Sequence, residues 1–196
     1  EPKSLVSKLL TYRSENVMQP LWGRLYNAPS RMTGKTDHTY ALEILSDIFG
    51  GDTTSYLYRE LVLNQKLAVN AGAYYNPNRL GPSQFSIYAS PLPGVTVQHI
   101  ESAINDIIAT FLSDGILEEE IYRSINAKIA GAAFARDSIK TASQILGSLL
   151  ASGQTLTDIE NWPHKISKVD LNAVTAAAQH IFLNGNFITT HLLDKN

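Results

Sequence analysis

The sequence contains no cysteine, which excludes disulfide bonds, thiolate zinc sites and a cysteine nucleophile. Only 17% of its 196 residues are charged and the formal net charge is −2, so there is no electrostatic reason to expect nucleic acid or an anionic membrane as a partner. No apolar run approaches the roughly 20 residues of a membrane-spanning helix. A chain of this length is large for one domain and small for two, and we expect residues 1–196 to form a single domain.

The histidines lack the spacing of a zinc-binding pair. Zinc peptidases place two histidines and a glutamate on one helix, so that the ligands share a face and the glutamate activates a water molecule. No two histidines here lie within five residues of each other; they are His38, His99, His164, His180 and His191. The serine-nucleophile motif G-x-S-x-G and the phosphate loop G-x-x-x-x-G-K-[ST] are also absent. We therefore expect no catalytic residue and no metal site in this chain.

Apolar periodicity predicts two strands, two helices, two strands, several helices and a closing strand. The expected strands are residues 5–13, 20–27, 69–76, 84–90 and 187–193. Thr96 is expected to cap a long helix that ends at Gly115, and Asp170 to cap the last helix. Strands and helices in separate blocks are typical of an α+β fold. We expect an antiparallel or mixed sheet of about five strands, covered by helices on one face.

Residues 42–73 are the most informative stretch. An apolar helix, which Asp37 can cap, runs into Gly50 and Gly51, where we expect glycine to end it. A second helix ends near Asn64, and a strand follows. A loop between two helix ends that faces a strand can present polar groups to a ligand. This stretch is therefore the first candidate for a ligand-facing site.

Several tyrosines gather in or near the same stretch. They are Tyr56, Tyr58, Tyr74, Tyr75 and Tyr88. Tyrosines commonly pack their rings against the core and keep the hydroxyl at the surface. The alternative is an aromatic wall for an extended peptide, and the sequence leaves both interpretations open.

Five further features, in their order and spacing, carry a resemblance to a known family. They are the helix with its double glycine at residues 37–51, the serine-x-leucine start at residues 55–58 with Leu67-Ala68 after it, the break at residues 91–94, the helix start at residues 115–121, and the final segment with Trp162 and residues 169–174. Together they resemble the C-terminal, non-catalytic domain of pitrilysin/insulinase-type zinc peptidases. The mitochondrial processing peptidases and the respiratory-complex core proteins belong to the same family. The resemblance covers nearly the whole chain.

The resemblance implies a division of labour between two domains. In this family the zinc motif H-x-x-E-H lies in an N-terminal domain of similar fold, so this chain is expected to be a fragment that lacks that domain. Zinc is then expected in the partner or upstream domain and no cofactor in this chain. The implied partners are that zinc-bearing domain, in the same polypeptide or as a separate subunit, a peptide substrate, and a second copy in a homodimer. Because bacterial relatives with this layout are often exported, the resemblance also suggests a periplasmic location.

The resemblance further implies where substrate contacts would lie. Active pairs in the family often contribute an arginine and a tyrosine, seven residues apart, from this half. Those places are taken here by Val62 and Val69, which cannot donate a hydrogen bond, while Arg59 lies one helical turn before Val62. Tyr56 stands where many relatives have arginine. The residues assigned to the substrate chamber are Tyr56, Arg59, Val62, Val69 and Tyr74.

Three functions follow as hypotheses. The first is a non-catalytic peptidase domain, inactive on its own, that helps to enclose peptides beside an H-x-x-E-H domain. The second is a structural or assembly subunit without a proteolytic role. The third is a stand-alone module that binds unfolded peptides.

Overall fold

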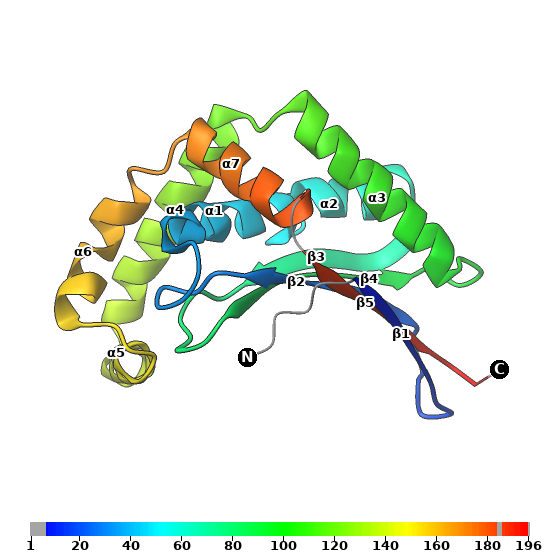
Figure 1. The fold of residues 1–196 in the computed structure, drawn as a ribbon, viewed down its shortest axis with the longest axis horizontal. Coiled ribbons are helices and arrows are strands. Elements are labelled where there is room, and N and C mark those ends of the chain that lie inside the picture. The colour runs from blue at the N-terminus through cyan, green and yellow to red at the C-terminus, as the bar shows by residue number, and fades with distance from the viewer. Residues whose placement is uncertain (1–6, 184–185, 196) are drawn as a thin grey trace.

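A computed structural model describes residues 7–183 and 186–195, which form helices packed on one five-stranded sheet (Figure 1). The strands are β1 (Lys8–Arg13), β2 (Leu21–Ala28), β3 (Ala68–Tyr75), β4 (Ser83–Pro91) and β5 (Phe187–Leu193). Their order in the sheet is β1-β5-β2-β4-β3. β1 and β5 pair in parallel, and the other neighbours pair antiparallel. The predicted α+β fold is therefore confirmed, with a mixed sheet.

The α-helices of the described residues are α1 (Thr39–Gly50), α2 (Tyr56–Tyr58), α3 (Val97–Asp114), α4 (Glu118–Arg136), α5 (Ile139–Ala151), α6 (Leu156–Ile166) and α7 (Leu171–Phe182). The helices that pack on this sheet lie on one face, as the sequence predicts, while α5 lies beyond the end of the sheet against α4 and α6 (Figure 1). The core fills the space between the two layers, and Trp22, Phe49 and Phe85 are among its fully buried side chains. No helix in the described part of the chain is long and apolar enough to cross a membrane.

The long helices begin where the sequence predicts caps. The Thr96 side chain accepts a hydrogen bond from the backbone N–H of His99, and the Asp170 side chain accepts one from Ala173. Gly115 follows α3 with a φ of 83°, a backbone conformation that glycine adopts without strain. β1 begins at Lys8, and residues 5 and 6 of that predicted strand lie outside the described residues.

The central helix α1 begins differently from the prediction. Asp37 lies inside a short 3₁₀ turn, η1 (Thr36–His38), which runs directly into α1. The backbone is already helical at His38, with φ of −79° and ψ of −10°, so no extended residue is left to act as a cap. The prediction that Asp37 caps α1 is wrong.

Gly50 ends α1 as predicted, but for a different reason. Gly51 has a φ of −75°, so the helix end needs no left-handed residue. Instead, a Cβ atom on Gly50 would lie 2.2 Å from the backbone nitrogen of Ala73 in β3. Glycine at this position lets the end of α1 lie directly on β3.

The segment after α1 contains a turn that its apolar pattern does not reveal. α2 is only three residues long, and η2 (Arg59–Asn64) continues it as a π-helix, in which Gln65 donates to the carbonyl of Glu60. The helical segment ends at Asn64, as predicted. Single π turns are frequent at functional sites.

Candidate functional site

None of the described helices covers the opposite face of the sheet, which we call the open face (Figure 1). Many of its side chains are apolar. Strand alternation defines it, because Trp22 and Tyr26 of β2 and Phe85 and Ile87 of β4 point into the core, and so their sequence neighbours point the other way. The strand register places side chains from all five strands on this face. Its large side chains are Leu10, Tyr12, Leu21, Leu25, Tyr74, Tyr88, Ile188 and Leu192.

Two glycines sit in the middle row of the open face. Gly23 on β2 and Gly72 on β3 are the cross-strand neighbours of Tyr88 on β4. A Cβ on Gly72 would come within 2.6 Å of the Tyr88 hydroxyl oxygen, and a Cβ on Gly23 within 2.7 Å of the Thr190 hydroxyl oxygen. The Tyr88 ring and the Thr190 hydroxyl therefore occupy the space that larger residues at Gly72 and Gly23 would fill. Because the Tyr88 ring lies over Gly72, the middle of the open face stands low above the sheet.

Three of the five predicted chamber residues lie at the helical layer. Tyr56 packs its ring 5.0 Å from that of Phe111 on α3, centroid to centroid. Arg59 forms an ion pair with Glu120 at the start of α4, with an N–O distance of 3.3 Å, and Val62 packs against the core. These three side chains do not reach the open face.

The other two lie on β3, the strand at one edge of the sheet. Tyr74 is 61% exposed and belongs to the open face, opposite Ser86 of β4. Val69 is half exposed at an irregularity where the pairing shifts between Ala68 and Asn70. The structure thus does not bring the five residues into one cluster, and their contact with a substrate stays a prediction.

The structure separates the tyrosines of the group by their burial, while an aromatic wall for a peptide stays a prediction. Tyr75 is buried, its hydroxyl donates to the carbonyl of Pro29 at 2.6 Å, and burial raises its pKa. Tyr74 and Tyr88 point to the open face and offer rings and hydroxyls there. Only these two tyrosines of the group are placed to contact a molecule on the open face.

The family model for the peptidase M16 inactive domain matches residues 14–128, more than half of the chain. The chain belongs to this family. The matched range contains β2, β3 and β4, which supply the centre and one edge of the open face. The resemblance drawn from the sequence is confirmed, and the family description itself names an inactive peptidase domain. A comparison with curated proteins finds no match.

Solved structures show the same fold over nearly all of this M16 inactive domain. A protease from Helicobacter pylori has a TM-score of 0.87 at 18% identity, covering 97% of this chain and 45% of its own. A peptidase M16 inactive domain from Pseudomonas fluorescens has a TM-score of 0.74 at 16% identity, covering 97% and 43%. A chain of complex III2 from Candida albicans has a TM-score of 0.76 at 13% identity, covering 98% and 47%. The present chain therefore spans less than half the length of each of these three.

A buried polar cluster lies on the helical side of the sheet in this M16 domain, and sequence reasoning missed it. Arg24 of β2 forms an ion pair with Glu101 of α3 at 2.7 Å and donates to Asn105 at the same distance. His191 of β5 lies 3.4 Å from the second oxygen of Glu101. Arg24 was the residue from which the sequence could have revealed this cluster, because a charged side chain on the apolar face of a strand requires a buried partner. Because the opposite charges offset each other beneath α3, the cluster holds α3 against β2 and β5.

The histidines of the M16 domain do not assemble into a metal site. Among residues 7–183 and 186–195, no group of three or more histidine, aspartate or glutamate side chains is placed to hold a metal ion. His38 and His180 form a close pair, whose rings stack with centroids 5.1 Å apart and join the start of α1 to the end of α7. Partial burial and the nearby Lys35 charge lower the pKa of both, against a smaller opposing effect of Asp37 on His38.

This histidine pair is expected to make the domain less stable at acidic pH. Because the pKa of each lies below the ordinary value of 6.5 in the folded state, the unfolded chain takes up these protons first as the pH falls. The free energy of unfolding should therefore drop between pH 7.5 and pH 5.5. Urea unfolding at the two pH values should show a smaller drop for His38→Gln combined with His180→Gln. An equal drop in the parent and the double variant would contradict the assignment.

Proposed function

We propose that this domain forms one wall of a peptide-enclosing chamber and that a second domain, which carries H-x-x-E-H and its zinc, forms the rest. The observation that supports the proposal is the open face. Contiguous exposed apolar surface of this kind marks an interaction site, because isolated domains rarely leave such an area in water. In this arrangement the chain contributes neither a zinc ligand nor a catalytic base, in agreement with the inactive domain described for its family.

The open face suits an extended peptide in its shape and its chemistry. Gly23 has no side chain and the Tyr88 ring lies over Gly72, so the middle row is low and a peptide backbone could lie across the strands. Tyr88 within that row and Tyr74 in the neighbouring row offer aromatic rings, whose hydroxyls can donate to or accept from peptide groups. The apolar side chains of β1, β2 and β5 would contact the partner domain or apolar residues of the peptide.

Reconstitution tests the proposal. The H-x-x-E-H domain encoded in the same polypeptide, or in a neighbouring gene, is incubated with an unstructured fluorogenic peptide, with and without this chain. Cleavage that requires the chain supports the proposal. A stable complex whose cleavage rate does not depend on the chain would favour an assembly role, and peptide binding at micromolar affinity by the chain alone would favour a stand-alone module. Absence of any complex with the zinc-bearing domain would contradict the proposal.

A charge on the open face should disrupt this function selectively. Tyr74→Lys places an ammonium on the open face, and we expect it to lower peptide cleavage by the reconstituted pair about tenfold, the effect of losing roughly 1.4 kcal/mol of binding. Tyr122→Lys on α4 is the matched control, since Tyr122 is 69% exposed on the helical side. Both substitutions should leave the free energy of unfolding within about 0.5 kcal/mol of the parent. Equal cleavage by the two variants would contradict a role for the open face.

A further inference from the structure

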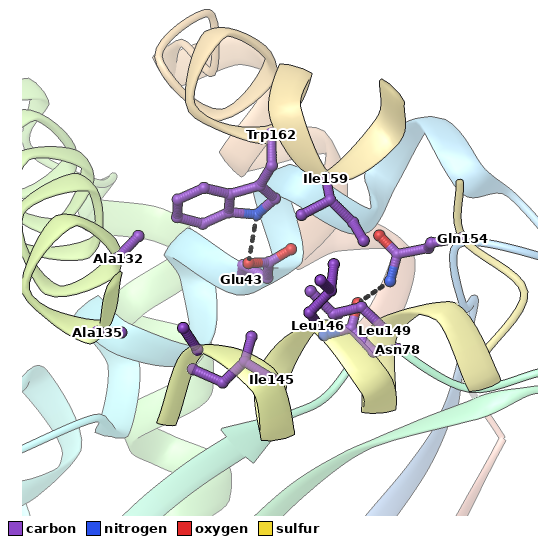
Figure 2. Close-up of a pocket in the computed structure, with 11 residues that line it drawn as sticks. Glu43, Asn78, Ala132, Ala135, Ile145, Leu146, Leu149, Gln154, Ile159 and Trp162 are labelled. Carbon is purple, nitrogen blue, oxygen red and sulfur yellow. Dashed lines mark hydrogen bonds between the residues drawn. The ribbon is translucent and has the colours of Figure 1, made fainter. Parts of the chain in front are cut away.

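A cavity of about 390 Å³ lies between α5 and α6, beside α4 (Figure 2). Four helices, α1, α4, α5 and α6, contribute to its walls. Its volume falls within the range of about 300–1,000 Å³ that is typical of small-molecule sites. The chamber proposed above makes no use of it.

The cavity walls are mainly aliphatic. α5 supplies Ile145, Leu146 and Leu149, and α4 faces them with Ala132 and Ala135, whose small side chains leave the space open. None of the residues of α5 is fully buried, and Ile145 and Leu146 remain 42% and 38% exposed. An aliphatic molecule in the cavity would remove this surface from water, which is favourable.

One side of the cavity is polar but carries no net charge. Glu43 accepts hydrogen bonds from the guanidinium of Arg31 and, at 3.3 Å, from the indole nitrogen of Trp162 (Figure 2). Because Arg31 offsets the carboxylate, an ammonium group would gain little here. An anionic group would meet the Glu43 oxygens.

Gln154 supplies an unused acceptor. Its side-chain nitrogen donates to Asn78 at 2.9 Å, and its carbonyl oxygen points toward the cavity beside Ile159 (Figure 2). As a whole residue Gln154 is 8% exposed, and its side-chain oxygen, which accepts no hydrogen bond from a described residue, is not one of the fully buried atoms without a partner. A donor on a ligand would therefore replace water at this acceptor.

We propose that this cavity binds a neutral aliphatic amphiphile whose head group donates an N–H or O–H hydrogen bond to Gln154. The aliphatic walls favour the alkyl chain of the ligand, Glu43 paired with Arg31 disfavours a charged head group, and the free carbonyl of Gln154 favours a head group that donates a hydrogen bond. The site is independent of the open face, since none of the residues that line the cavity belongs to the open face. Failure of either proposal leaves the other intact.

Fluorescence of Trp162 provides the test, with octanamide as the probe. The chain has two tryptophans, Trp22 and Trp162, and the emission of Trp22 must be removed first. Trp22 is fully buried, and its indole nitrogen has no hydrogen-bond partner among the described residues. Trp22→Phe therefore removes the second fluorophore without breaking a hydrogen bond. In that background octanamide should give a saturable change in Trp162 emission. Hexanamide should bind about 15-fold more weakly, because each buried CH₂ contributes roughly fourfold. Octanoate should bind at least tenfold more weakly than octanamide.

Three variants assign the binding to this cavity. Ala135→Leu fills it and should weaken octanamide at least tenfold, whereas Ala133→Leu, on the exposed side of the same helix, should leave affinity unchanged. Gln154→Leu keeps the size but removes the acceptor, and should weaken octanamide about fivefold. Circular dichroism and urea unfolding, recorded for each variant, identify any that does not fold. The proposal is overturned if octanamide gives no saturable change, if octanoate binds as tightly, or if folded Ala135→Leu and Gln154→Leu both bind octanamide like the parent.

Discussion

Replacing Gly50 with alanine should destabilise the domain by about 3 kcal/mol or more. The new Cβ would lie 2.2 Å from the backbone nitrogen of Ala73 and 2.7 Å from the carbonyl carbon of Gly72. Backbone atoms in a paired strand cannot move aside as a flexible side chain can, so α1 and β3 would have to separate. Because α1 is the central helix and most of its residues are buried, the loss would extend through the core. Urea unfolding monitored by circular dichroism measures the effect.

Gly131→Ala is the matched control. Gly131 lies within α4, and a Cβ there would meet no atom within 4 Å. Alanine is the better helix former by about 0.5–1 kcal/mol, so this substitution should stabilise the domain. If Gly50→Ala cost no more than about 1 kcal/mol, the close approach of α1 to β3 would be wrong.

Replacing Glu43 with leucine should cost about 3–5 kcal/mol. Glu43 and Arg31 form an ion pair in which the two side chains are 13% and 7% exposed. Removing the carboxylate leaves the buried guanidinium without its counter-charge and the Trp162 indole nitrogen without its acceptor. Adding Arg31→Met to Glu43→Leu should recover part of the loss, since an apolar pair replaces a buried charge. The comparison is again made by urea unfolding.

Arg31→Met alone should give a stability that falls as the pH rises. Burial raises the pKa of Glu43, and Arg31 opposes that effect, so the pKa should rise further once the guanidinium is gone. The folded variant then keeps the Glu43 proton at pH values where the unfolded chain has lost it. The free energy of unfolding should therefore decrease as the pH rises above the ordinary glutamate value of about 4.5. A variant whose stability did not decrease relative to the parent over this range would contradict the buried position of Glu43.

Most of the secondary structure could be predicted from local patterns in the sequence. The caps at Thr96 and Asp170 and the stop at Gly115 depend on residues within a few positions of each other, and the sequence predicted all three. The cap at Asp37 failed because η1 already sets the backbone into helical geometry there. The close contact of Gly50 joins residues 22 or more positions apart, and apolar periodicity holds no information at that range.

Tertiary pairing explains what the sequence could not say about the candidate site. Tyr74 and Tyr88 share a face only because β3 and β4 pair in a particular register, and the parallel pairing of β1 with β5 brings the first and last strands together on the side of the sheet opposite β3. The assignment of Tyr56, Arg59 and Val62 to the substrate chamber came from the family resemblance. The π turn and the contacts with α3 and α4 place these side chains at the helical layer, and their contact with a substrate stays a prediction.

Photo-crosslinking from the open face tests the central claim most directly. A photoreactive p-benzoylphenylalanine is placed at position 74 or, as the control, at position 122, and each protein is irradiated with the zinc-bearing domain and an unstructured peptide. The chamber account predicts crosslinks to that domain or to the peptide from position 74 and none from position 122. Crosslinks from position 122 alone would place the partner on the helices and contradict the account.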